Sequence, residues 1–228
     1  MAFWGSFAAK LARHYRVIRF DARNAGASTF EGTFTLADVA GDAAALLEHL
    51  GIAPVLVVGH AWGGRVAQVF ARDFPHLVRG MVICGTGGEL PPVDTATIVA
   101  QQKAARAAGD REAWQAAFEA LWFAPGYRER APGKFSEIFD LLSTMKPRHQ
   151  ARWDARACPS ASYWGKARVP ARLFYGKWDK NGTPENGTDL AAKLDCELTL
   201  FDDAGHFLVR EKEDEMIAGI EAFAGSLT

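Results

Sequence analysis

The chain has 228 residues, 49% of them hydrophobic, and its 26 basic and 27 acidic residues give a formal net charge of −1. This composition excludes a disordered chain, and the balanced charge gives no electrostatic attraction to nucleic acid or to an anionic membrane. The first residues lack the charged region and continuous apolar core of a signal peptide, and no apolar run approaches roughly 18 residues, so we expect neither a signal peptide nor a membrane span. Its three cysteines are odd in number and have no metal-binding spacing, so we interpret them as free thiols of a cytoplasmic protein. We also expect neither a metal nor a cofactor.

The N-terminal part predicts a helix, a strand and a second helix. Apolar residues recur at helical spacing over residues 3–13, and residues 15–20 alternate like a strand before a turn cluster at 21–28. Thr35 and Asp38 form a helix-start box, and the helix that follows is expected to end at Gly51.

The next stretch predicts a strand, a sharp turn and a helix. An apolar run at 55–58 leads into a Gly-x-Ala-x-Gly turn from Gly59 to Gly63, and a helical pattern begins at Arg65. We expect a Cβ atom at either of these glycines to clash with neighbouring backbone. Ala61 then occupies the strained apex where an enzyme of this kind carries its nucleophile, yet a methyl group can attack nothing.

Strands and helices then alternate on both sides of a helical insertion. Residues 79–84 predict a buried strand, while residues 91–167 predict three or four helices and no strand. The alternation resumes with a strand at 171–176, a helix at 183–194, a strand at 197–201 and a helix at 211–225 whose first turn carries acidic residues. The helices of the insertion are expected at 95–108, 111–122, 134–145 and 147–156.

This order of elements predicts an α/β fold. We expect a mostly parallel sheet of about five or more strands, flanked by helices, with residues 1–90 and 168–228 as the core and 91–167 as a helical lid. Ligands of such sheets bind at the carboxyl ends of the strands, where Ala61 also lies.

The turn around Ala61 resembles the Gly-x-Ser-x-Gly nucleophile elbow of the α/β-hydrolase superfamily, with Ala61 in place of the serine. Residues 21–28 are similar to the segment that precedes the elbow in that superfamily. The resemblance implies two or three further strands and an oxyanion loop before the first helix, which this sequence does not contain. Since a sheet without its strand beside the elbow exposes unpaired backbone, we expect a homodimer that supplies the missing pairing.

Two further motifs follow predicted strands and resemble the superfamily's acid and base. Asp179 closes a Gly-x-x-Asp motif after residues 171–176, and His206 closes a Gly-His motif after 197–201. Taken singly, each residue would be interpreted as a helix cap or a packed side chain. Together with the elbow, they are interpreted as the acid and base of a Ser-His-Asp mechanism, and the backbone N–H of Trp62 as an oxyanion donor. His60 is expected to pack under the elbow.

The substrate prediction rests on three segments, 81–88, 99–108 and 121–127, that resemble 3-oxoadipate enol-lactonases and related esterases. Because Leu121 stands where those enzymes tend to carry a basic residue, we expect a small apolar or weakly polar ester or lactone. The candidate substrate contacts are Trp122, Trp153 and Phe207. Arg128, Arg130 and Arg152 are alternative partners for a substrate carboxylate.

Three functional hypotheses stay open. The first is a serine ester or lactone hydrolase that is inactive because Ala61 replaces the nucleophile, either by design or in a natural member. The second is an epoxide hydrolase or haloalkane dehalogenase whose nucleophilic aspartate is replaced, with Tyr127 and Tyr163 as candidate lid tyrosines for epoxide opening. The third is a non-catalytic protein that binds a small molecule in the same pocket.

Overall fold

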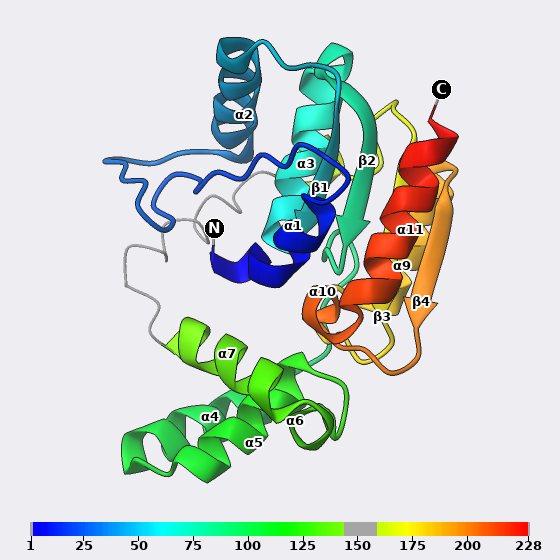
Figure 1. The fold of residues 1–228 in the computed structure, drawn as a ribbon. Coiled ribbons are helices and arrows are strands. Elements are labelled where there is room, and N and C mark those ends of the chain that lie inside the picture. The colour runs from blue at the N-terminus through cyan, green and yellow to red at the C-terminus, as the bar shows by residue number, and fades with distance from the viewer. Residues whose placement is uncertain (1, 144–158, 228) are drawn as a thin grey trace.

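A four-stranded parallel sheet forms the centre of the protein in the computed structural model, which describes residues 2–143 and 159–227 (Figure 1). The strands are β1 (Val55–His60), β2 (Val78–Cys84), β3 (Ala171–Gly176) and β4 (Glu197–Phe201). They lie in the order β1-β2-β3-β4, and each neighbouring pair is parallel. The carboxyl ends of all four strands therefore lie at one edge of the sheet, where the residues singled out in the sequence follow them.

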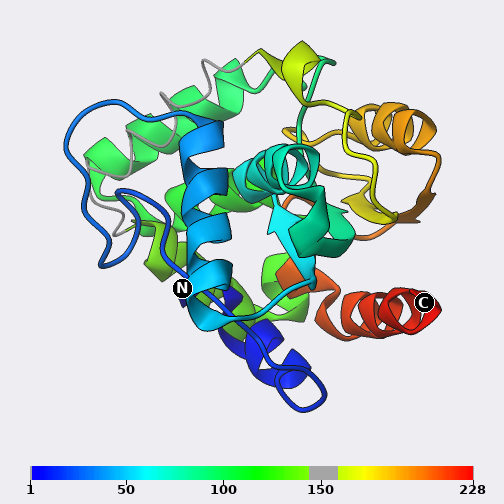
Figure 2. The ribbon, with the colours of Figure 1, turned by 90° about the horizontal axis from the view of Figure 1, so that it is seen from above.

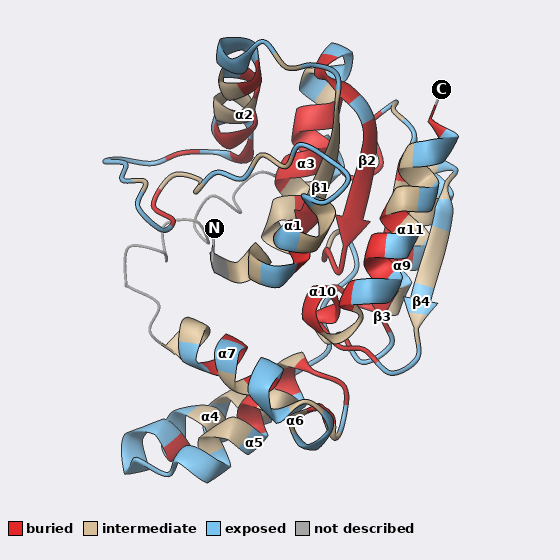
Figure 3. Ribbon diagram, viewed as in Figure 1, coloured by how far each residue is buried: buried red, intermediate tan, exposed pale blue. Residues whose placement is uncertain are grey.

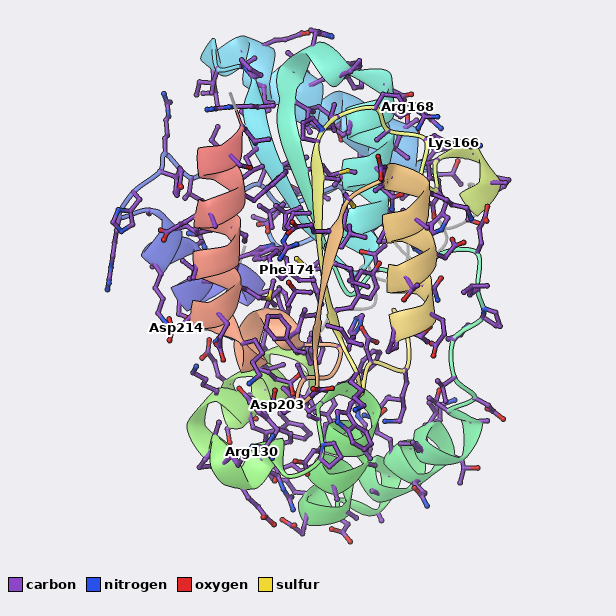
Figure 4. All side chains as sticks on the ribbon, turned by 90° about the vertical axis from the view of Figure 1, so that its right-hand side faces the viewer. Arg130, Lys166, Arg168, Phe174, Asp203 and Asp214 are labelled. Atoms are coloured by element: carbon purple, nitrogen blue, oxygen red, sulfur yellow. The ribbon has the colours of Figure 1, made fainter. Side chains whose placement is uncertain are left out.

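Helices cover both faces of the sheet (Figures 1 and 2). One face carries α2 (Leu36–Leu50), α3 (Trp62–Asp73) and α9 (Pro184–Leu194), and the other carries α1 (Gly5–Leu11), α10 (Leu208–Glu211) and α11 (Glu213–Ser226). Successive strand residues point to opposite faces, so Met81 and Ile83 pack with the first group while Val82 and Cys84 pack with the second. Figure 4 shows the sheet edge-on, with α11 and α9 on opposite sides and Phe174 in the core.

Several local predictions are confirmed by the helix ends. Thr35 and Asp38 form a full capping box at the start of α2, and Gly51 ends that helix with φ of 63°. The predicted helix 211–225 is confirmed as α11, which begins two residues later, at Glu213. The short helix α10 before it was not predicted, and it ends where the chain leaves helical geometry at Lys212, whose φ and ψ are −124° and 41°. A short 3₁₀ helix, η1 (Ala2–Trp4), directly precedes α1.

Tyr163, Trp164 and Ala167, near the end of the predicted insertion 91–167, pack in the core on the α3 side of the sheet. The part of the insertion formed by residues 96–143 lies at the carboxyl edge of the sheet (Figures 1 and 3). It contains α4 (Ala96–Ala108), α5 (Arg111–Trp122), α6 (Tyr127–Arg130) and α7 (Pro132–Ser143), and its aromatic side chains form a cluster of their own that also includes Phe207 of the core. The short helix α6 occupies a stretch predicted as loop. The predicted helix 147–156 lies outside the described residues.

The expectation of five or more strands is wrong for the part of the chain that the structure describes. Residues 16–20 have no regular secondary structure, although their sequence alternates like a strand. A strand needs a neighbour for its backbone hydrogen bonds, and β1 pairs on one side only, with β2. None of the described helices is both long enough and apolar enough to cross a bilayer.

The open edge of β1 leads us to propose that two copies of the chain associate through it. An exposed strand edge offers unpaired N–H and C=O groups that another strand can complete. Light scattering coupled to gel filtration should then give about twice the monomer mass of 24.8 kDa. A single species with the monomer mass at micromolar concentration would contradict this proposal.

Candidate active site

Ala61 stands at the apex of the turn between β1 and α3 in a conformation that alanine rarely adopts, with φ of 52° and ψ of −116°. Its backbone N–H donates to the carbonyl of Cys84 at 2.9 Å. This bond ties the apex to the end of the neighbouring strand β2. Trp62 is the first residue of α3, so its backbone N–H lies at the positive end of that helix.

Close backbone approach under the apex requires glycine at one predicted position and not at the other. A Cβ on Gly59 would lie 2.5 Å from the carbonyl oxygen of Gly63, as expected from the sequence. A Cβ on Gly63 meets no atom within 4 Å, so the expectation of a clash there is wrong. The second tight position is Gly64, where a Cβ would lie 2.0 Å from Oγ1 of Thr86.

Asp179 and His206 lie together at the carboxyl edge of the sheet. His206 Nδ1 is 2.9 Å from Oδ2 of Asp179, and the two side chains are 5% and 0% exposed. The other carboxylate oxygen of Asp179 accepts the backbone N–H groups of Asn181 and Gly182, both at 2.8 Å. These two donors fix the carboxylate, which in turn accepts Nδ1–H from the imidazole and leaves Nε2 without that proton.

The loop that carries His206 is braced against the helical insertion. The backbone N–H groups of His206 and Phe207 both donate to the carbonyl of Trp122, at 2.8 and 3.3 Å. The indole of Trp122 also packs beside the imidazole, with ring centroids 5.2 Å apart. A Cβ on Gly205 would lie 2.6 Å from the carbonyl carbon of Phe123, so only glycine allows this approach.

The carboxylate of Glu211 also holds the His206 loop against the helical insertion. Glu211 accepts the backbone N–H of Ala124 at 3.0 Å with one oxygen and that of Gly205 at 2.8 Å with the other. The sequence placed Glu211 in the first turn of a helix, but it is the last residue of α10 and points at the loop. Burial raises its pKa to about 7, against the opposing effect of the two backbone donors.

His60 packs beside the elbow, as expected. Its Nε2 lies 2.6 Å from the backbone carbonyl of His206, to which it donates, and its ring stacks on Phe3 at a centroid distance of 5.2 Å. Burial, together with the smaller effect of the nearby His206, lowers its pKa to about 3. His60 is therefore neutral and acts as a donor that supports the backbone of the His206 loop.

A cavity of about 820 Å³ opens beside the apex. Ala61, Trp62, Trp122, His206 and Phe207 all line it, so the structure brings these predicted residues together. Its volume is within the range of small-molecule sites. The remaining described wall is rich in aromatic rings, and it includes Phe3, Trp114, Phe118 and Phe139. Trp153, the other predicted substrate contact, lies outside the described residues.

The arginines proposed from the sequence do not line this cavity in the described part of the chain. Arg128 forms an ion pair with Glu112 at 2.7 Å, and Arg130 donates to the carbonyl of Pro125 at 2.7 Å. Arg152 lies outside the described residues. Four described cations that line the cavity were not predicted from the sequence: Arg16, Arg65, Lys103 and Arg106. The position of Arg65 four residues after the apex, one helical turn away, could have indicated it.

Comparisons with known proteins agree on one family. A family profile described as the alpha/beta hydrolase fold matches residues 1–213. The chain is 28% identical over 216 residues to 3-oxoadipate enol-lactonase 2 of Acinetobacter baylyi, which covers 85% of the chain and 73% of that protein. A second relative is BpoC of Mycobacterium tuberculosis, a candidate non-heme bromoperoxidase. The matched stretch of 80 residues is 43% identical to it, but this stretch is only 35% of this chain and 30% of BpoC.

Solved structures agree on the fold. The enol-lactonase of Burkholderia xenovorans LB400 superposes with a TM-score of 0.80 at 24% identity, covering 99% of this chain and 86% of that one. A thermophilic esterase of Thermogutta terrifontis gives the same TM-score at 20% identity, covering 99% of this chain and 85% of that one.

The glycine geometry under the apex predicts opposite outcomes for two neighbouring substitutions. Gly59→Ala places a methyl group against backbone that cannot move aside, so we expect a loss of about 2 kcal/mol or more in the free energy of unfolding. Gly63→Ala has room and should change stability far less. Urea unfolding of both variants measures the difference, and an equal loss in the two would contradict the geometry.

The raised pKa of Glu211 predicts a pH dependence of stability. A carboxyl group whose pKa is raised from 4.5 to about 7 binds its proton more tightly in the folded state. Its contribution is therefore full below about pH 4.5 and is lost as the pH rises through about 7, a change of about 2–3 kcal/mol between pH 5 and 8.

Glu211→Gln should remove this part of the pH dependence in melts at pH 5, 6.5 and 8. Glu215→Gln is the matched control, because that carboxylate is 56% exposed and lies 3.5 Å from Lys212 on the surface. If the Glu211→Gln protein keeps the wild-type pH dependence, the proton of Glu211 does not contribute to it.

Proposed function

We propose that this chain, which belongs to the alpha/beta hydrolase family, binds a small carboxylic ester or lactone. Its site is arranged for a Ser-His-Asp mechanism, but Ala61 leaves that mechanism without its nucleophile. The observation that carries this proposal is the hydrogen bond of 2.9 Å between Asp179 and His206, because His206 lines the same cavity as Ala61. The 3-oxoadipate enol-lactonase and esterase relatives support the substrate class.

The roles follow from the chemistry of the three positions. With serine at position 61, Nε2 of His206 would take the hydroxyl proton as the oxygen attacks the ester carbonyl. Asp179 would hold the imidazole in the required tautomer and stabilise its positive charge. Nε2 would return this proton to the departing alkoxide, which leaves as the alcohol when the acyl-enzyme forms. The free nitrogen would then take a proton from the water that hydrolyses the acyl-enzyme, and would give it back to the serine oxygen.

The oxyanion of this reaction would form at the start of α3. The N–H of Trp62 lies at the positive end of that helix, where developing negative charge is stabilised. No metal or cofactor is needed for these steps, since the attacking oxygen, the proton acceptor and the oxyanion donor all come from the protein.

Ala61 removes the atom that attacks while keeping the cavity around it. Loss of a triad nucleophile lowers kcat by about 10⁶-fold in the best-studied case. We therefore propose that this chain binds its ester and does not form an acyl-enzyme. We also propose that the helical insertion acts as a lid, because Trp114, Phe118 and Trp122 from it wall the cavity.

The aspartate-nucleophile alternative has less support. Epoxide opening would use tyrosine hydroxyls that face the substrate, and neither candidate is among the described residues that line the cavity. The hydroxyl of Tyr127 donates to the carbonyl of Arg210, and Tyr163 is buried in the core on the α3 side of the sheet.

Restoring a nucleophile tests the proposal. We expect Ala61→Ser to release nitrophenol from p-nitrophenyl acetate with an acyl burst, at a rate far above that of the unchanged chain. His206→Ala in the serine background should abolish the burst, because the hydroxyl then has no base.

Ala61→Asp, measured alongside, separates the alternatives. Turnover of an epoxide or haloalkane by the aspartate form, with a silent serine form, would replace the serine mechanism by the aspartate one. If all three folded proteins are inactive and still bind an ester, the site is a binding site only.

A further inference from the structure

Arg65 lies in the cavity wall one helical turn after Ala61, on the same side of α3. Its Nε–H donates to the carbonyl of Gly87 at 3.1 Å. Gly87 lies in the loop after β2, where a Cβ would stand 3.5 Å from Nη2 of Arg65 and 2.7 Å from the carbonyl oxygen of Asn181. The guanidinium is therefore held between α3 and the turn that carries Asp179.

Among the residues that the structure describes, no carboxylate pairs with this guanidinium. Among the described residues, Arg65 takes part in no ion pair, whereas Arg23, Arg172 and other arginines of the chain do. The Nε–H is satisfied by Gly87, and the Nη groups of a guanidinium carry four further N–H donors. A half-buried arginine tethered through Nε thus presents its Nη side for another acceptor.

The charges of the described cavity wall point the same way. They are the cations Arg16, Arg65, Lys103 and Arg106 and the single carboxylate of Asp21. A concave wall of one predominant sign attracts ligands of the opposite sign and raises their local concentration. The cavity therefore favours an anion over a neutral molecule of the same shape.

We propose that Arg65 binds a carboxylate of the ligand, so that the ester or lactone of this site is an acidic one. Planar carboxylates match the fork of N–H donors on a guanidinium. The distance from Arg65 to the apex, about one helical turn or ~5 Å of rise, places this carboxylate a few bonds from the ester carbonyl.

This assignment rests on the proposed function and revises one expectation drawn from the sequence. The neutral substrate was favoured because Leu121 replaces a basic residue in the insertion. Leu121 is buried and does not line the cavity in the described part of the chain. The positive charge comes from α3 instead, next to the apex.

Ligand titration of the unchanged chain tests the assignment, because Ala61 leaves the ester intact during the measurement. Trp62 and Trp122 line the cavity, so their fluorescence reports binding. Monomethyl succinate carries a carboxylate, and methyl butyrate is its neutral counterpart of similar size. We expect monomethyl succinate to bind at least tenfold more tightly.

Arg65→Gln should lower the affinity for monomethyl succinate by roughly 10–100-fold, which is the usual effect of losing a hydrogen bond to a charged group. The affinity for methyl butyrate should stay unchanged. Arg168→Gln is the matched control, since Arg168 also donates to backbone carbonyls, of Gly165 and Ala167, but does not line the cavity. Figure 4 shows Arg168 at the end of the sheet opposite the helices of the insertion. Arg168→Gln should leave both affinities unchanged. Equal affinities for the two esters, or an equal loss of both in Arg65→Gln, would overturn the assignment.

The result is separable from the test of the proposed function. If Ala61→Ser forms an acyl-enzyme but neither protein prefers the acidic ester, the hydrolase proposal stands and the role of Arg65 is refuted. If Arg65 holds the acidic ester while Ala61→Ser never reacts, the carboxylate site stands and the hydrolase proposal fails.

Discussion

The close approach of backbone beneath Ala61 is the constraint on which the site depends. The chain can turn from β1 into α3 within one residue only because Gly59 and Gly64 leave no Cβ atoms between the strand, the helix and Thr86. A non-glycine residue at φ of 52° costs free energy, which the packing of β1 and α3 must offset. The direction of the apex, the start of α3 and the position of Arg65 one turn later all follow from this turn.

A second set of contacts places the base relative to the apex. His206 is fixed by Asp179 through its ring and by Trp122, Gly205 and Glu211 through its loop. Because Trp122 and Ala124 belong to the helical insertion, the base is held jointly by the sheet and by the insertion. Any movement of the insertion that opens the cavity therefore also strains the hydrogen bonds that position the imidazole.

The charges of the cavity act on a different part of the ligand from the catalytic groups. In the proposed complex, the aromatic wall would contact the apolar body of the ligand, the apex and Trp62 would face its carbonyl, and Arg65 would bind its carboxylate. Such a division allows a site that lacks its nucleophile to retain a defined ligand preference. Under this proposal, binding and bond cleavage depend on different residues.

The sequence by itself determined the local features that depend on short-range chemistry. The capping box at Thr35, the need for glycine at 59, and the placing of Asp179 and His206 directly after parallel strands follow from residue type and spacing. Periodicity could not show that residues 16–20 would lack a strand partner, because pairing depends on a neighbour far away in the sequence. For the same reason it assigned Glu211 to a helix start and overlooked Arg65. The carboxylate of Glu211 meets Ala124 and Gly205, and the guanidinium of Arg65 meets Gly87, only once the tertiary structure has brought these segments together.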